Sequence, residues 1–112
     1  MGERKVVLLS SEKLGLGDDK LGGLLMANFL RLLGEDDRHP AMICLLNSGV
    51  NLVTGGHVCL DHMRRLESLG TTILICKTCL EYMDLEDKVA VGKVSNMKEI
   101  QSQLIQGDAM TL

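Results

Sequence analysis

Two cysteines separated by two residues stand where a short apolar run ends. Cys76 closes the run 72–75, and Cys79 follows at the start of a helix-compatible segment. If the run is a buried strand, Cys76 lies at its carboxyl end, which is where open α/β sheets place their ligand sites. A helix N-terminus carries partial positive charge and favours thiolate over thiol. The pair therefore predicts a nucleophilic thiol at the edge of a sheet.

Several chemistries fit a Cys-x-x-Cys pair. A thioredoxin-like dithiol has a proline downstream of the motif, whereas the only proline here, Pro40, lies upstream. A structural zinc site needs two further ligands, and Cys44 in a predicted strand and Cys59 on a predicted helix face do not converge with the pair. Two small buried residues without chemistry are a third alternative. The remaining interpretation is sulfur transfer, in which a thiolate accepts a sulfur atom as a persulfide, without metal or cofactor.

Two residues inside the motif are predicted to assist the cysteines. Lys77 lowers the pKa of the neighbouring thiol if its ammonium lies close to the sulfur, and is otherwise a solvated side chain. Thr78 offers a hydroxyl that can cap the short helix. The histidines are expected at the surface or partly buried rather than as bases; they are His39, His57 and His62.

Two polar loops are predicted to reach the same edge of the sheet, because each follows an apolar run and the carboxyl ends of parallel strands meet there. Their candidate pocket residues are Gly15, Gly17, Asp18, Asn47, Ser48 and Gly49. The second loop offers amide donors to an anionic sulfur species, or else forms an ordinary strand-to-helix turn. The first loop is not a dinucleotide site, because Lys20 stands where the third glycine of that fingerprint belongs.

Apolar runs and helical periodicity alternate along the chain. Strands are predicted at residues 4–10, 41–46, 72–76 and 89–91, with a marginal fifth at 110–112. Helices are predicted from residue 18 or 19 to 34, 57 to 69, 80 to 83, and 95 or 96 to 107. This alternation predicts an α/β protein with a parallel sheet that is covered on both faces.

Apolar spacing also predicts the faces of two helices. In the first helix, the apolar residues that follow helical spacing and so form one stripe are Leu21, Leu24, Leu25, Phe29 and Leu32. In the last helix the residues predicted to face inward are Met97, Ile100 and Leu104. Gly22 and Gly23 are expected in the first helix only if another backbone packs closely against that turn.

Length and composition argue against several classes of protein. The 112 residues predict one domain spanning 1–112, and the net charge of −3 with only two aromatic residues argues against nucleic-acid binding. No apolar run approaches the roughly 20 residues that span a bilayer, and the apolar run near the N-terminus is too short for a signal peptide. A cytoplasmic protein with four reduced thiols is expected.

A series of short motifs resembles one family. In order they are Gly-Leu-Gly-Asp at 15–18, Leu-Gly at 21–22, Asn-Ser-Gly-Val at 47–50, Leu-Gly at 69–70, Cys-x-Thr-Cys-Leu at 76–80 and Val-Gly-x-Val-Ser-Asn-Met at 91–97. They resemble the DsrE/DsrF-like family, most closely the C-terminal domain of the YedF-type selenium metabolism proteins, which are described as sulfurtransferase-like. The similarity runs from about Lys5 to Leu112.

This resemblance implies a three-layer α/β/α sandwich with a mostly parallel sheet of about five strands, in the order 4-3-2-1-5. It also implies cytosolic sulfur relay or selenium-related chemistry, a donor or acceptor protein from such a pathway, and homo-oligomers. By position, the persulfide carrier of the family matches Cys76, and Cys79 resolves or assists. Lys77 departs from the family, which has glycine there. Full-length YedF-type proteins also carry an N-terminal TusA-like domain, and the resemblance here is to their C-terminal domain. The alternatives are a non-catalytic oligomeric binding module of the same fold and a thiol-disulfide redox protein.

Overall fold

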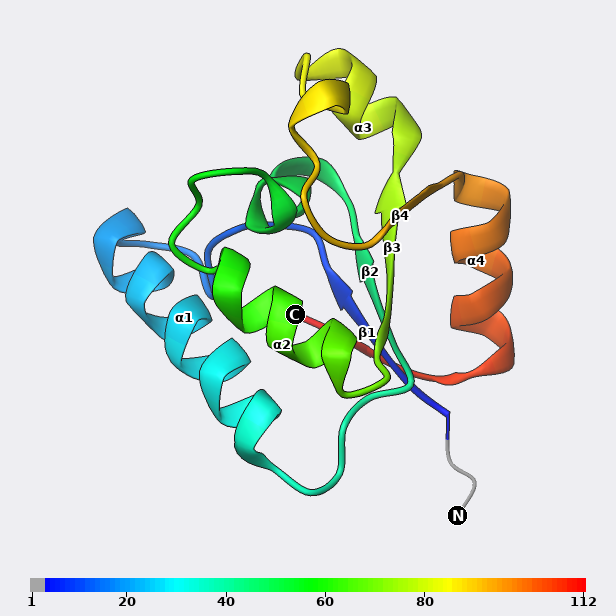
Figure 1. Cartoon of the computed structure of the whole chain (residues 1–112), viewed down its shortest axis with the longest axis horizontal. Coiled ribbons are helices and arrows are strands. Elements are labelled where there is room, and N and C mark those ends of the chain that lie inside the picture. The colour runs from blue at the N-terminus through cyan, green and yellow to red at the C-terminus, as the bar shows by residue number, and fades with distance from the viewer. Residues whose placement is uncertain (1–3) are drawn as a thin grey trace.

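A sheet of five strands forms the centre of the protein (Figure 1). A computed structural model of the chain describes residues 4–112, so the first three residues of the predicted domain lie outside the described residues. The strands are β1 (Lys5–Leu9), β2 (Met42–Leu45), β3 (Thr72–Cys76), β4 (Lys93–Ser95) and β5 (Asp108–Thr111). They pair in the order β4-β3-β2-β1-β5, and these pairings are all parallel. This is the order that the family resemblance implies.

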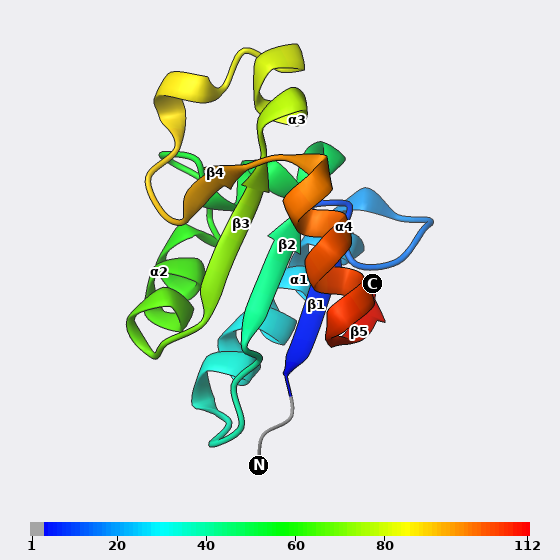
Figure 2. The same ribbon diagram turned by 90° about the vertical axis from the view of Figure 1, so that its right-hand side faces the viewer.

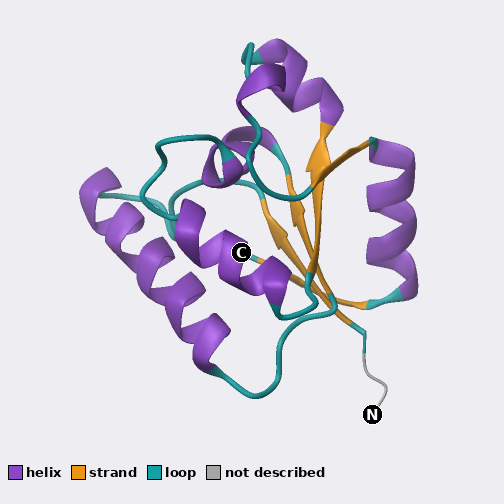
Figure 3. Cartoon of the chain, in the orientation of Figure 1, coloured by secondary structure: helices purple, strands orange, loops and turns teal. Residues whose placement is uncertain are grey.

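Helices cover both faces of the sheet, which explains why its inner strands are unbroken apolar runs. α1 (Asp19–Glu35) and α2 (Leu60–Ser68) lie side by side on one face, and α4 (Met97–Gln106) lies on the other (Figure 3). The larger part of the core is shared with α1 and α2, and a smaller cluster lies under α4 around Ile100. The three-layer α/β/α sandwich is therefore confirmed. Among the described helices, none combines the length and apolarity needed to cross a bilayer.

Three short helical segments gather at the carboxyl edge of the sheet. They are η1 (Asn47–Val53) after β2, α3 (Lys77–Tyr82) after β3, and η2 (Glu86–Lys88) before β4. Figure 2 shows α3 standing beyond the end of β3, clear of the layer that the strands form. η1 instead lies directly against the sheet, because a Cβ at Gly49 would come within 2.4 Å of the Leu9 carbonyl oxygen. The same carbonyl accepts the Leu46 N–H at 3.1 Å, so η1 is fixed to the end of β1.

The fourth strand begins later than the apolar run at residues 89–91 predicts. Val89 forms an antiparallel bridge with Thr54, and the Ala90 N–H donates to the Val53 carbonyl at 2.8 Å, so this run pairs with the end of η1. The chain joins β3 only after Gly92, whose φ of +88° makes the turn and whose missing Cβ would lie 3.0 Å from Ile73. The prediction of strand 89–91 is wrong because another segment takes its backbone hydrogen bonds.

The helix starts that depend on caps are confirmed. The Asp18 carboxylate accepts the Leu21 N–H at 2.8 Å at the start of α1, and the Asn96 side chain accepts the Glu99 N–H at 2.9 Å at the start of α4. Gly34 does not end α1, which continues through Glu35.

The predicted helix faces need correction. In α1 the buried residues are Gly22, Met26, Leu30 and Gly34, whereas exposed leucines make up most of the apolar stripe predicted from spacing. The reason is close packing at glycine, since a Cβ at Gly22 would lie 3.0 Å from Lys13 and one at Gly34 would lie 3.5 Å from Arg65. In α4, Ile100 is buried as predicted, but Met97 is half exposed.

Two glycine substitutions test the contact between η1 and the end of β1. Gly49→Ala forces η1 away from the Leu9 carbonyl, and we expect it to lower the free energy of unfolding by at least about 2 kcal/mol. Gly23→Ala is the matched control, because nothing lies within 4 Å of its added Cβ and alanine favours the helix, so stability should be kept or raised by up to about 1 kcal/mol. Urea unfolding followed by circular dichroism measures both, and equal stability of the two variants would contradict the assigned contact.

Candidate functional site

Cys76 lies at the junction of β3 and α3, where it ends the strand and is the N-cap of the helix. Only 2% of its surface is exposed. Along β3 the side chains of Leu74 and Cys76 point to the same face, and both pack in the cluster under α4 with Cys44 and Ile100. Cys76, which matches the family's persulfide carrier by position, is therefore enclosed, because α4 covers the tip of the strand.

Cys79, the third residue of α3, is the more accessible of the two thiols. Its side chain is half-buried, and its sulfur accepts a hydrogen bond from the Asn47 N–H at 3.1 Å. Asn47 is the first residue of η1, so this N–H has no acceptor within its own helix. Asn47 also has a left-handed backbone, with φ of 51°. The predicted amide donor from the second loop is thus present, and it meets Cys79 rather than Cys76.

The electrostatics of Cys79 differ from the expected activated thiolate. Burial raises the pKa of Cys79, the Asn47 N–H partly opposes this, and the neighbouring Cys76 raises it further. The helix that was expected to favour the thiolate is only six residues long. At neutral pH the resting thiol is therefore mainly protonated.

Neither Lys77 nor Thr78 acts on the sulfurs. The Lys77 ammonium is on the exposed side of α3, 4.0 Å from the Glu81 carboxylate, and its side chain is 63% exposed. This agrees with the alternative of a solvated side chain. Thr78 is exposed within the first turn of α3, and the N-cap position that it was predicted to serve is occupied by Cys76, without a side-chain cap bond.

The first predicted loop is not brought to the cysteines. Gly15 and Gly17 are exposed turn residues with φ of +88° and +125°, and Asp18 caps α1. Figures 1 and 2 both show the N-terminal end of α1 away from α3. These residues shape the entry to α1.

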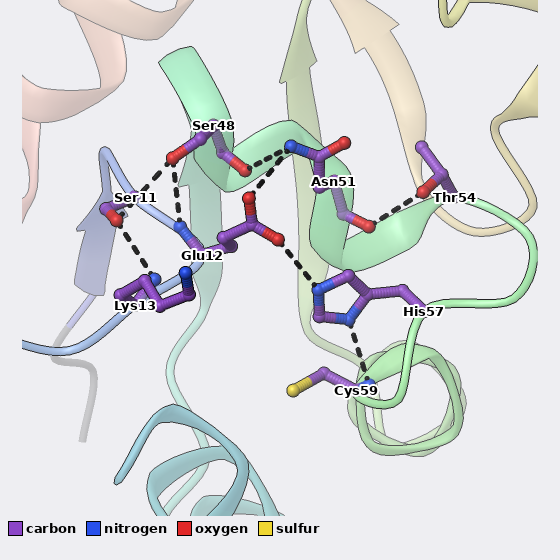
Figure 4. Close-up of polar contacts among 8 residues, drawn as sticks. All are labelled: Ser11, Glu12, Lys13, Ser48, Asn51, Thr54, His57 and Cys59. Atoms are coloured by element: carbon purple, nitrogen blue, oxygen red, sulfur yellow. Dashed lines mark hydrogen bonds and ion pairs between the residues drawn. The ribbon is translucent and has the colours of Figure 1, made fainter. Parts of the chain in front are cut away.

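The second loop reaches both the cysteines and a polar cluster (Figure 4). Next to Asn47, the Ser48 hydroxyl accepts the Glu12 N–H at 3.2 Å and lies 3.5 Å from the Ser11 hydroxyl. Gly49 is buried and allows the close approach to β1 described above. Ser48 and Gly49 therefore hold η1 in place, while Asn47 alone of the three contacts a cysteine sulfur.

Glu12 and His57 form the centre of this cluster, which sequence patterns do not reveal. The Cys59 N–H donates to Nδ1 of His57 at 3.0 Å, so the ring proton is on Nε2, which donates to a Glu12 carboxylate oxygen at 3.1 Å. The other Glu12 oxygen accepts from the Asn51 side chain at 3.3 Å. Glu12 and His57 are 45 residues apart, and no local spacing links them. The cluster ties the loop after β1 to η1.

The remaining cysteines are buried core residues, as predicted. Burial, with a smaller effect of Glu99, raises the pKa of Cys44 to about 11. Burial, with a smaller effect of Glu12, also raises the pKa of Cys59. Within residues 4–112, no three His, Cys, Asp or Glu side chains gather in a way that could hold a metal ion. The chemistry available at this edge is that of the Cys76–Cys79 pair.

Comparison with known proteins identifies the fold. The chain matches no protein-family model and no curated protein sequence. Among solved structures, the YchN protein from E. coli superposes with a TM-score of 0.73 at 13% identity, covering 97% of this chain and 99% of that chain. The protein of unknown function MTH1491 from Methanobacterium thermoautotrophicum gives 0.71 at 17% identity, covering 99% of this chain and 100% of that chain. BT1422 from Bacteroides thetaiotaomicron, a conserved protein of unknown function, gives 0.65 at 14% identity, covering 97% and 95% of the two chains. These similarities confirm the DsrE-like fold.

The order and pH dependence of thiol alkylation test the site. In the native protein we expect Cys79 to react before the three buried cysteines. Because its pKa is raised, its rate should keep rising with pH beyond about 8.5, the range of a free cysteine. Iodoacetamide labelling followed by peptide mass spectrometry measures both. A rate that levels off below neutral pH would contradict the raised pKa.

Two variants of Asn47 separate its backbone from its side chain. Asn47→Gly keeps the left-handed backbone and the N–H at the sulfur, so the alkylation rate of Cys79 should change little. Asn47→Ala disfavours that backbone by about 1 kcal/mol, which should weaken the donated hydrogen bond, raise the pKa of Cys79 further and slow its alkylation at neutral pH. If both variants slow the reaction equally, the side chain rather than the N–H acts on Cys79.

Proposed function

We propose that the protein is a sulfur relay protein that carries a sulfur atom as a persulfide on Cys79. The observation that carries the proposal is the bond from the Asn47 N–H to the Cys79 sulfur, within a Cys-x-x-Cys pair at the carboxyl edge of the sheet. Cys79 replaces Cys76 as the proposed carrier because Cys76 is only 2% exposed. The DsrE-like fold is consistent with this chemistry.

The transfer step needs only the thiol and the amide. The Cys79 thiolate attacks the outer sulfur of a donor persulfide, the sulfur–sulfur bond of the donor breaks, and the donor leaves as its own thiolate. A backbone N–H at the accepting sulfur stabilises negative charge there, before transfer and again when the sulfur is passed on. The raised pKa keeps the resting thiol protonated, and a protonated thiol is a poor target for oxidants.

The wider assignment follows the motif resemblance to YedF-type selenium metabolism proteins. We propose that the protein acts in the cytoplasm, as a homo-oligomer, with a donor and an acceptor from a sulfur or selenium pathway. Selenium is an equivalent cargo, because a thiolate accepts it by the same displacement. No metal or cofactor enters the proposal.

A non-catalytic binding module is the second candidate function. It is favoured by exposed leucines along α1, which are Leu21, Leu24, Leu25 and Leu32. Exposed apolar stripes of this kind mark interaction surfaces. In that case Cys79 would behave as an unreactive thiol.

Loading with sulfur tests the proposal. The reduced protein is incubated with a cysteine desulfurase and cysteine, and its intact mass is measured under non-reducing conditions. We expect a gain of one sulfur atom that thiol reductants remove, and no gain in Cys79→Ser. Cys59→Ala serves as the control, because this cysteine is buried away from the pair, and it should load like the wild type.

Two results would count against sulfur carriage on Cys79. One is a wild-type protein that neither gains sulfur nor forms a disulfide between Cys76 and Cys79, which favours the binding module. The other is a Cys79→Ser variant that loads as well as the wild type, which removes Cys79 as the carrier.

A further inference from the structure

We infer that the Cys76–Cys79 pair can also discharge the bound sulfur as hydrosulfide, using its own two thiols as the reductant. The inference rests on the proposed persulfide at Cys79. It adds an activity, because a relay protein passes sulfur on at the same oxidation level, whereas discharge reduces it. Three features support it: the spacing of Cys76 and Cys79, their unequal burial, and the reactivity of a persulfide toward a second thiol.

Spacing places the two cysteines within bonding reach. Cys76 is the N-cap of α3, and an N-cap side chain points toward the backbone of the third helical residue, which here is Cys79. No cap hydrogen bond engages the Cys76 side chain. The two thiols already interact, since a side-chain interaction with Cys76 is among the causes that raise the pKa of Cys79, and small changes in the first turn bring the cysteines to the separation of a disulfide. Cys76 and Cys79 can therefore join while β3 stays in the sheet.

Unequal burial gives the two thiols different roles. Cys79 is reachable from outside, whereas Cys76 is enclosed between β3 and α4. An external sulfur donor therefore meets Cys79 first, and the enclosed Cys76 is kept for attack on its neighbour. Cys44 does not compete, because it lies opposite Leu74, one row of side chains below Cys76.

The proposed reaction balances without an external reactant. The Cys76 thiolate attacks the inner sulfur of the Cys79 persulfide, and a Cys76–Cys79 disulfide forms. The bond from Cys79 to the outer sulfur of the persulfide anion breaks, and the outer sulfur leaves with the electron pair. It takes up the proton that Cys76 released, which gives hydrosulfide. The sulfur atom gains two electrons and the two cysteines lose two. A dithiol, or two molecules of a monothiol, then reduces the disulfide and resets the pair.

A single-turnover experiment tests the discharge. Reduced protein, freed of reductant, receives less than one equivalent of inorganic polysulfide, is desalted at once, and is followed by a sulfide assay and by intact mass. The wild type should release sulfide and end two hydrogen atoms lighter than the reduced protein, with Cys76 and Cys79 joined in one peptide pair. Cys76→Ala should keep the added sulfur and release sulfide at least about tenfold more slowly, because it lacks the intramolecular attack. Cys44→Ala is the matched buried control and should behave as the wild type.

The outcomes separate this inference from sulfur carriage. If the wild type keeps its added sulfur as long as Cys76→Ala does, or releases sulfide without forming the disulfide, discharge is wrong and carriage stands. If neither protein gains sulfur and no disulfide forms, carriage fails and discharge fails with it. The wild-type time course decides the question even if Cys76→Ala does not fold, which circular dichroism would reveal.

Discussion

The close approach of Gly49 to the Leu9 carbonyl is the contact on which the geometry of the cysteine site depends. A side chain at this position would push η1 away from β1. η1 begins with Asn47, whose left-handed backbone presents its N–H to the Cys79 sulfur, so any shift of η1 moves the donor. The Glu12 cluster holds the same segment through Ser48 and Asn51. The Cys79 sulfur on a short helix is thereby tied, through η1, to the end of β1.

Burial and hydrogen bonding oppose each other at Cys79, and burial has the larger effect. The thiol is close enough to the core to pack against both of its clusters, and loss of water disfavours the thiolate more than one N–H favours it. The lysine next to Cys76 in the chain does not change this balance, because its ammonium lies beside Glu81. The site thus holds the Cys79 sulfur in place and partly shields it, rather than keeping its thiolate permanently ionised.

Much of the fold could be predicted from local patterns, while most of the site could not. The run 72–76 is a strand because it is apolar and β-branched, and Asp18 and Asn96 begin helices because their oxygens accept free N–H groups. Residues 89–91 have the same apolar character but pair with the end of η1, a choice that depends on a distant segment. The burial of Cys76 likewise depends on α4, which comes later in the chain, and the bond from Glu12 to His57 follows only from the packed topology.

Because α3 lies beyond the end of β3, Cys79 is carried by a segment that is not part of the sheet. The first turn of α3 carries Cys79, while the segment 77–92 leaves the sheet and returns to it without contributing a strand. Met83 and Leu85 of this segment pack against the core, whereas Tyr82, Asp84 and Glu86 are exposed. Exchanges at these exposed positions would leave the strand pairing untouched and alter the surface next to α3. Changes confined to the segment 77–92 could thus give the same sheet a different choice of binding partner.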